Sequence, residues 1–265
     1  MKTEPFELVG LIPAAGHARR LALANGSKEL LPVPNGYRPD ELQPVTAGLL
    51  QQMQSARCAR VFCITRAEKA DIAQAFGSGS RYHLPMAYLM IEDSWGPPFT
   101  LAPAFKFAPG AGFAFGFPDI MVDPPDAMGH IASKLRSGSA DVVMATFPAS
   151  DGQGVDMADG DDDGPVTAIV PKEENPAWPA AGKTWLLAVW RPSFTAFFEQ
   201  ALKHFREQMS EQPAAVQDLP TGKIFAQALK AGLTIDSVHF PHGRFLDIGS
   251  PDRLTTANDF YQRTR

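Results

Sequence analysis

The chain has 265 residues, of which 45% are hydrophobic and 20% carry a charge. This length and composition are typical of a folded protein with a sizeable core, and they exclude bulk disorder. The formal net charge of −5, without a basic tail, makes nucleic acids and anionic membranes poor partners. Any anionic ligand must therefore be bound by a local group of cations.

The N-terminal stretch, the apolar runs and the cysteines indicate a cytoplasmic protein. MKTEPFELVG has no charged leader followed by a long apolar core, so no signal peptide is expected. The longest apolar runs, AGFAFGF and WLLAVW, are too short to span a bilayer. Cys58 and Cys63 are not spaced like a metal site or a redox pair, and we expect them to be buried, reduced thiols.

Strands and helices alternate through the first half of the chain. FELVGLIP predicts a strand that ends at Pro13, and RVFCITR and MAYLMIE predict two more. Helices are predicted in ELQPVTAGLLQQMQSA and AEKADIAQAF, and a helix start in PFTLAPAFKFA. GFAFGFPDIMV predicts a strand followed by a loop, DAMGHIASKLRSG a helix and ADVVMATF a strand. This alternation predicts a Rossmann-like arrangement of parallel strands with helices on both faces.

The pattern changes after residue 150. DGQGVDMADGDDDGPVTAIVPK is acidic and rich in turn residues before its apolar run, and KTWLLAVWRP predicts another strand. We expect these two strands to form a β-hairpin insertion that adds antiparallel to the sheet. Helices are predicted in SFTAFFEQALKHFREQM and TGKIFAQALKAG, short strands in TIDSVHF and GRFLDIG, and a closing helix in SPDRLTTANDFYQR with Ser250 as N-cap. Residues 1–265 are thus predicted to form one α/β domain with a mixed, mostly parallel sheet.

A basic loop follows the first predicted strand. The stretch GLIPAAGHARRLALANGSKELLPV places small residues after the strand and then Arg20 and Lys28. Ligands of doubly wound sheets bind beyond the carboxyl ends of the strands, which is where this loop would lie. Its backbone amides could face an anion, although neither Walker spacing nor a dinucleotide fingerprint is present. Taken alone, the loop is equally consistent with ordinary surface cations.

Five segments in order resemble motifs of the sugar-1-phosphate nucleotidyltransferases, such as glucose-1-phosphate thymidylyltransferases and UTP–glucose-1-phosphate uridylyltransferases. PAAGHARRL followed by SKELLPV is similar to the family loop and its Lys-x-Leu-Leu-Pro. TLAPA resembles the segment near the base, and FPDIMV the Gly-Asp at the end of a central strand. DGPVTAIVPKEENP resembles the hairpin with Glu-Lys-Pro-x-x-Pro, and FLDIGSPDRLTTAND the Trp-x-Asp-x-Gly-Thr-Pro ending.

The resemblance implies the nucleotide-diphospho-sugar transferase fold and a Mg²⁺-dependent reaction. A nucleoside monophosphate would pass from a nucleoside triphosphate to a sugar 1-phosphate, or to a similar phosphorylated small molecule, with release of pyrophosphate. The resemblance implies that Arg20 and Lys28 bind the triphosphate, that Lys172 meets the sugar phosphate, and that Asp119 and Asp247 hold the metal. The implied nucleotide contacts are Ala14, Ala15, Gly16, His17, Thr100 and Leu101.

The sequence departs from the family pattern at positions that bear on activity. Ala18 and Arg19 replace a glycine and a threonine of the loop, Pro118 replaces a glycine before Asp119, and Pro171 replaces the glutamate before Lys172. A non-catalytic nucleotide- or sugar-phosphate-binding protein therefore stays open as an alternative. So does a glycosyltransferase that uses a nucleotide sugar. The identity of the base, that of the sugar, and the choice between a monomer and a homo-oligomer do not follow from the sequence.

Overall fold

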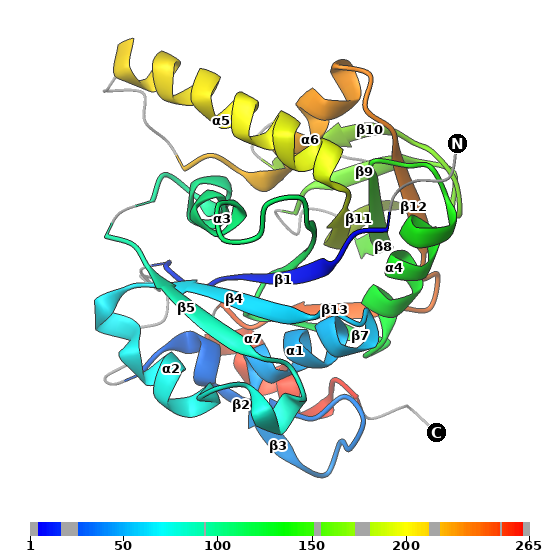
Figure 1. Ribbon diagram of the computed structural model, residues 1–265. Helices are drawn as coiled ribbons and strands as arrows, with labels where there is room; N and C mark the ends of the chain where they lie inside the picture. Colours follow the sequence, from blue (N-terminus) through cyan, green and yellow to red (C-terminus); the bar gives the residue numbers. More distant parts are fainter. Residues whose placement is uncertain are drawn as a thin grey trace.

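The computed structural model describes residues 5–16, 26–92, 94–150, 155–172, 181–211, 218–249 and 251–261. The strands form a nine-stranded sheet and two small two-stranded sheets (Figure 1). The large sheet contains β1 (Leu8–Pro13), β4 (Arg60–Thr65), β5 (Met86–Met90), β6 (Gly112–Gly116), β8 (Val142–Ser150), β9 (Met157–Gly160), β10 (Val166–Val170), β11 (Ala181–Trp190) and β12 (Ile235–His239). The small sheets are β2 (Pro32–Pro34) with β3 (Leu42–Pro44), and β7 (Ile120–Asp123) with β13 (Arg244–Asp247). The helices are α1 (Val45–Ser55), α2 (Ala70–Phe76), α3 (Pro97–Phe105), α4 (Ala127–Ser137), α5 (Pro192–Glu211), α6 (Thr221–Lys230) and α7 (Pro251–Thr256).

Short apolar runs form the parallel part of the large sheet. β1 pairs in parallel with β4 and β6, and β4 pairs in parallel with β5. β11 pairs antiparallel with β6 on one edge and with β8 on the other, and β8 pairs in parallel with β12. The main order is therefore β12-β8-β11-β6-β1-β4-β5, in which β11 alone runs against its neighbours. This arrangement confirms the predicted mixed, mostly parallel sheet.

Helices cover both faces of this sheet, as predicted. In Figure 1, α3, α5 and α6 lie above the sheet, and α1 and α2 lie below it. The upper helices share a buried cluster rich in aromatic side chains, in which Trp190 stacks on Phe198 and Phe194 on Phe225. A second buried cluster joins α1, α2 and α4 to the opposite face. Because both faces are covered, the free positions for a ligand are at the ends of the strands.

The insertion after residue 150 has one strand more than predicted. MADG, which the sequence indicates as part of a turn-rich segment, forms β9. β9 pairs antiparallel with β10 and with the first half of β11, so β10 is separated from β11 by β9. Asp and Gly are poor strand formers, but the edge of β11 left open beside β6 supplies a pairing partner. The predicted antiparallel addition is confirmed, and the predicted neighbours within it are wrong.

Residues 120–123, predicted as a loop, instead form β7. This strand pairs antiparallel with β13, with Ile120 opposite Asp247 and Asp123 opposite Arg244. Below the pair lies a third buried cluster, formed by Val33, Val45, Met121, Ile248, Ala257 and Phe260. A strand made by a partner from the other end of the chain carries no local signal, which explains the wrong prediction.

The closing helix is shorter than predicted. α7 ends at Thr256, and a 3₁₀ turn covers Ala257–Asp259. Ser250, the predicted N-cap, lies outside the described residues. Across the part of the chain that the structure describes, no helix has both the length and the hydrophobicity that a membrane crossing requires.

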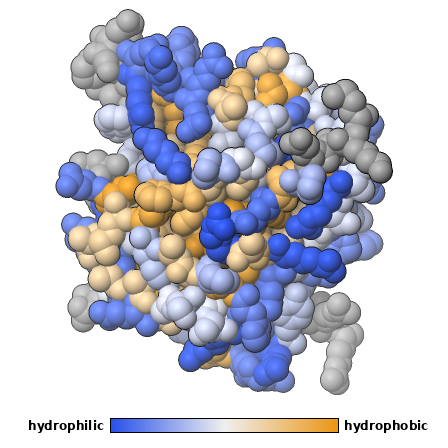
Figure 2. All heavy atoms as spheres, in the orientation of Figure 1, coloured by the Kyte–Doolittle hydropathy of each residue, from blue (hydrophilic) through white to orange (hydrophobic). Residues whose placement is uncertain are grey.

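Apolar side chains also reach the surface. Figure 2 shows them gathered across the central part of the face in view, with polar residues around them. The exposed large apolar side chains include Met90 at the end of β5, Trp95 before α3 and Phe107 after it.

Candidate active site

The predicted nucleotide loop begins at the carboxyl end of β1. The Ala14 amide donates a hydrogen bond to the Ile64 carbonyl (2.8 Å), which extends the pairing of β1 with β4. Ala14 and Ala15 are buried, whereas Gly16 is exposed with open space around it. The loop therefore leaves the sheet at the edge where ligands of such folds bind. His17 and Arg20, which are further predicted residues of this loop, lie outside the described residues.

Lys28 lies on a 3₁₀ turn, Lys28–Leu30, that follows the loop. Its ammonium group forms an ion pair and hydrogen bond with the Asp119 carboxylate, and the two side chains are only 21% and 16% exposed. Burial lowers the pKa of Lys28, but the negative charges of Asp119, Glu29 and Asp247 outweigh it, and the pKa is raised. Lys28 is therefore a positive charge held against acidic side chains.

Asp119 lies in the turn that leads from β6 into β7. The Thr46 hydroxyl donates to the Pro118 carbonyl (2.9 Å), and the Ile248 amide donates to the Asp119 carbonyl (3.1 Å). The turn is thus fixed by α1 on one side and by the segment after β13 on the other. These contacts hold Asp119 in place, although Pro118 replaces the glycine that precedes the aspartate in the family motif.

Asp247 is the last residue of β13 and lies opposite Ile120. Its Oδ1 accepts a hydrogen bond from the Gly249 amide (2.8 Å), and its Oδ2 lies 3.8 Å from Nη1 of Arg253. The pairing of β7 with β13 therefore brings Asp247 beside Asp119. Three residues predicted from three separate motifs, Lys28, Asp119 and Asp247, converge here.

The two carboxylates suit a hard divalent cation. Mg²⁺ takes oxygen ligands and is commonly held by one or two carboxylates together with substrate phosphates and water. Among the described residues, no group of three or more His, Cys, Asp or Glu side chains is arranged to hold a metal. Asp123, at the far end of β7, is ion-paired with Arg244 at 3.1 Å. The donor set of Asp119 and Asp247 therefore fits Mg²⁺ if a substrate supplies further oxygens.

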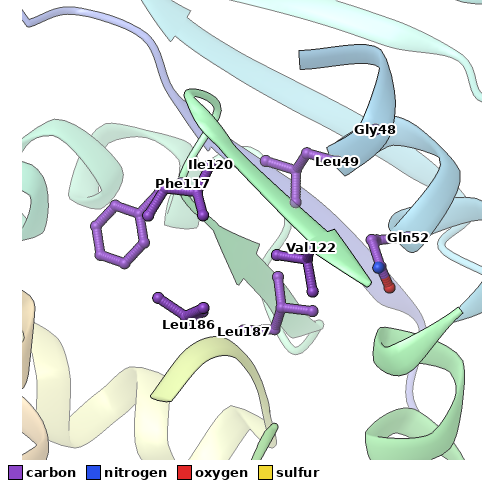
Figure 3. Close-up of a pocket in the computed structure, with 8 residues that line it drawn as sticks. All are labelled: Gly48, Leu49, Gln52, Phe117, Ile120, Val122, Leu186 and Leu187. Atoms are coloured by element: carbon purple, nitrogen blue, oxygen red, sulfur yellow. The ribbon is translucent and has the colours of Figure 1, made fainter. Parts of the chain in front are cut away.

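A small cavity is lined by residues on both sides of Asp119 in the sequence, including Phe117 and Ile120 (Figure 3). It is lined by Gly48, Leu49, Gln52, Phe117, Ile120, Val122, Leu186 and Leu187. The cavity volume of about 10 Å³ corresponds to about one water molecule. Its lining is apolar apart from Gln52, so the cavity is a packing defect and not a place for a nucleotide.

Lys172 follows β10 and is exposed. Its amide donates to Oδ1 of Asp156 (3.0 Å), and the Gly222 amide at the start of α6 donates to Oδ2 of the same carboxylate (3.0 Å). Asp156 therefore ties the end of the hairpin to α6. No described hydrogen bond or ion pair joins the Lys172 side chain to Lys28, Asp119 or Asp247, so the structure does not by itself bring this lysine into the cluster.

Thr100 and Leu101 lie in α3 and are both buried. The Thr100 hydroxyl is 2.6 Å from the Ser94 hydroxyl, and Leu101 packs in the upper hydrophobic cluster. Both side chains thus have structural partners. Gly96, just before the helix, has φ +102°, and a side chain here would meet the Leu219 backbone at 2.4 Å. This close contact docks the start of α3 against the segment before α6.

Two contacts beside Lys28 have no counterpart in the motifs. Lys69 donates to both carboxylate oxygens of the buried Glu29 (2.7 and 2.9 Å). Asp71 accepts hydrogen bonds from the amide and the hydroxyl of Ser27, both at 2.7 Å. The partners are separated by 40 and 44 positions, so no local spacing could have revealed them.

The chain was compared with known proteins. It is 24% identical over 252 residues to the low-salt glycan biosynthesis nucleotidyltransferase of Haloferax volcanii. The match covers 94% of this chain but 64% of that protein, so the chain spans less than two thirds of the length of this curated relative. No family model matches the chain.

Several solved structures share the fold. A protein from Bacillus anthracis assigned as a glucose-1-phosphate thymidylyltransferase, solved in complex with sucrose, is 17% identical with a TM-score of 0.77 over 97% of this chain and 96% of its own. A UDP-glucose pyrophosphorylase from Acinetobacter baumannii is 14% identical with a TM-score of 0.70 over 97% of this chain and 93% of its own. The resemblance indicated by the sequence motifs is thus confirmed: the chain is similar to sugar-nucleotide nucleotidyltransferases and has their fold.

Proposed function

We propose that the chain transfers a nucleoside monophosphate from a nucleoside triphosphate to a sugar 1-phosphate, or to a similar phosphorylated small molecule. The observation that carries this proposal is the meeting of Lys28, Asp119 and Asp247 at the carboxyl edge of the sheet. Both substrates are anions, and the chain has a net charge of −5, so a local cation is needed to bind them. The names of the similar proteins agree with this reaction class.

In the proposed reaction, Asp119 and Asp247 would hold Mg²⁺, which when bound withdraws negative charge from the α-phosphate. Lys28 binds the triphosphate and offsets charge on the departing pyrophosphate, with Arg20 proposed for the same task. Lys172 binds the phosphate of the acceptor. The proposed nucleotide contacts are Ala14 to His17, Thr100 and Leu101. Because the side chains of Thr100 and Leu101 are buried, their backbone groups would make the contact.

The bond changes need no protein nucleophile. A phosphate oxygen of the acceptor forms a bond to the α-phosphorus, and the bond from that phosphorus to the bridging oxygen of the β-phosphate breaks. Pyrophosphate leaves with the electron pair. The chain contributes binding, alignment and charge compensation, which can account for most of the barrier reduction in phosphoryl chemistry.

The test is a pyrophosphate-release assay that crosses the common nucleoside triphosphates with a panel of sugar 1-phosphates in the presence of Mg²⁺. One pair should give release, and Asp119→Asn should lower the rate by about a hundredfold or more because a charged metal ligand is lost. Asp141→Asn is the matched control, since Asp141 binds Ser193 and Thr234 away from the site. An equal rate in Asp119→Asn and the native protein would refute the assignment of Asp119.

The same assay separates the alternatives. If calorimetry shows that the protein binds a nucleotide and the assay shows no release of pyrophosphate, the chain is a non-catalytic binding protein. Release of UDP or GDP from a nucleotide sugar would indicate a glycosyltransferase. The proposed compartment is the cytoplasm, which the two free, buried cysteines support because free thiols persist in reducing surroundings.

A further inference from the structure

Lys69, directly before α2, and Asp71, in its first turn, hold the turn that carries Lys28. Lys69 and Asp71 follow β4, the strand next to β1 in the sheet, and bind Glu29 and Ser27. The residues directly before and after Lys28 are therefore both anchored to one short segment. From this arrangement we infer that Lys69 and Asp71 are positioning residues for Lys28, an inference that rests on the proposed role of Lys28 in binding the triphosphate.

The anchor after Lys28 is a buried ion pair. Glu29 is 1% exposed, and the Lys69 ammonium reaches both of its carboxylate oxygens. Charge-assisted hydrogen bonds of this kind are stronger than neutral ones, and two of them to one carboxylate fix its orientation. Since Glu29 belongs to the same 3₁₀ turn as Lys28, the pair fixes that turn relative to the segment between β4 and α2.

The anchor before Lys28 fixes the backbone directly. Asp71 uses one carboxylate oxygen for the Ser27 amide and the other for the Ser27 hydroxyl. The Leu30 amide donates to the Ser27 carbonyl at 2.9 Å, which closes the turn around Lys28. With both neighbours held, the Lys28 side chain extends from a fixed turn to its contact with Asp119.

This support matters because Lys28 lies on a three-residue 3₁₀ turn and not in a strand of a sheet. A lysine side chain loses rotational freedom when it binds a phosphate, and part of that cost is met beforehand if its backbone is already fixed. The Lys69–Glu29 and Asp71–Ser27 contacts thus contribute to ligand binding through Lys28, without touching the ligand themselves.

The first test measures the accessibility of Lys28 in the protein without ligands. Acetic anhydride labelling followed by mass spectrometry gives the modification rate of each lysine. In Asp71→Ala, Lys28 should be labelled about threefold faster or more, because its turn has lost two hydrogen bonds. Lys183, which is bound to Gly160 and Asp162, is the internal reference and should not change. Glu29→Gln should act in the same direction by weakening the Lys69 contact.

Asp141→Ala is the matched control variant. Asp141 also accepts hydrogen bonds from a hydroxyl and a backbone amide, in its case Ser193 Oγ and the Thr234 amide. It should leave the labelling of Lys28 unchanged at a comparable loss of stability. Equal labelling of Lys28 in Asp71→Ala and in the native protein would overturn the inference, and this result does not depend on nucleotide binding.

The second test asks whether Asp71 acts through Lys28. Nucleotide dissociation constants are measured by calorimetry for the native protein, Asp71→Ala, Lys28→Met and the double variant. Asp71→Ala should weaken binding by about tenfold in the native background and by less than about twofold when Lys28 is absent. Equal effects in both backgrounds would overturn the positioning role. If the native protein binds no nucleotide, the proposed function fails, and the labelling result still decides the inference.

Discussion

At the scale of single residues, the Lys28 ammonium group and the proposed metal ion would both bind the Asp119 carboxylate. The ammonium group is bound to Asp119, one of the two proposed metal ligands. A metal ion that binds Asp119 must displace this contact or share the carboxylate with it, and the two positive charges repel each other at short distance. On the proposed function, Lys28 would therefore compete for Asp119 with a metal ion that binds in the absence of nucleotide.

Replacement of Lys28 by methionine should have opposite effects on two ligands. Nucleoside triphosphate binding should weaken by about tenfold, because a charge-assisted contact to phosphate is lost. Binding of Mn²⁺ alone, followed by electron paramagnetic resonance, should tighten severalfold because Asp119 is released. Lys28→Arg keeps the charge and should leave Mn²⁺ binding close to native. Weaker Mn²⁺ binding in Lys28→Met would rule out this competition.

The two cysteines give a prediction about alkaline pH. Burial raises the pKa of Cys58 and of Cys63 from 9.0 to about 12. The folded protein thus keeps these protons after the unfolded chain has lost them. The stability linked to the thiols is complete below pH 9 and is lost as pH rises from 9 to about 12.

Urea unfolding between pH 8 and 10.5 checks this linkage. Each thiol should lower the free energy of unfolding by up to about 1.4 kcal/mol per pH unit within the window. The Cys58→Ala/Cys63→Ala variant should show a correspondingly flatter pH dependence, whatever its stability at pH 8. A slope that does not change would assign the alkaline loss of stability to other groups.

At the scale of elements, local patterns were sufficient for strands and helices that bury a regular face. β1, β4 and α4 fall within their predicted segments because apolar spacing and turn residues mark them. β7 was not predicted as a strand because its partner, β13, lies at the other end of the chain. β9 was not predicted because its short sequence, MADG, contains Asp and Gly, which are poor strand formers, although it pairs with the neighbouring β10. The candidate site shows the same division. The motifs indicated Lys28, Asp119 and Asp247, whereas Lys69 and Asp71 became visible only in three dimensions.

α1 contains a glycine that the structure does not require. A methyl group on Gly48 would meet only Gln43 Nε2, at 3.9 Å, which is an ordinary contact. Gly48 also lines the small cavity. Gly48→Ala should therefore raise the free energy of unfolding by about 0.5 to 1 kcal/mol, because alanine loses less backbone entropy in a helix.

Gly129 in α4 is the matched control for this prediction. A methyl group here would lie 3.0 Å from the Ser55 carbonyl oxygen, so the gain in helix propensity is opposed by a tight contact. Chemical denaturation of both variants should show a gain for Gly48→Ala and none for Gly129→Ala. Equal gains in the free energy of unfolding would mean that α1 and α4 move apart at little cost to accept the methyl group on residue 129.

At the scale of the whole molecule, the candidate site depends on the end of the chain. Phe260 packs with Met121 and Ile248 in the cluster below β7 and β13. Phe260→Ala should lower the free energy of unfolding by about 3 kcal/mol, and it should also weaken Mn²⁺ binding because Asp119 and Asp247 lose their common support.

Phe198→Ala provides the comparison for this prediction. Phe198 is buried in the upper cluster against Trp190, away from β7 and β13. It should cost a similar free energy in denaturation experiments while Mn²⁺ affinity stays native. Loss of Mn²⁺ affinity in both variants would mean that the metal site responds to global loosening, and not to the support beneath it.

Two strands, β6 and β9, pair with the same edge of β11, and this has a consequence for which changes in sequence the chain can accept. β6 pairs with Leu187–Trp190 on that edge, while β9 pairs only with Lys183 and Thr184. The β9–β10 hairpin, which leads to Lys172, therefore pairs with a short stretch of β11 that does not pair with β6. On the proposed function, insertions or exchanges between residues 151 and 180 could change the choice of acceptor and leave the support of Asp119 and Asp247 intact. On that function, catalysis and the choice of acceptor would rest on two separate parts of the fold.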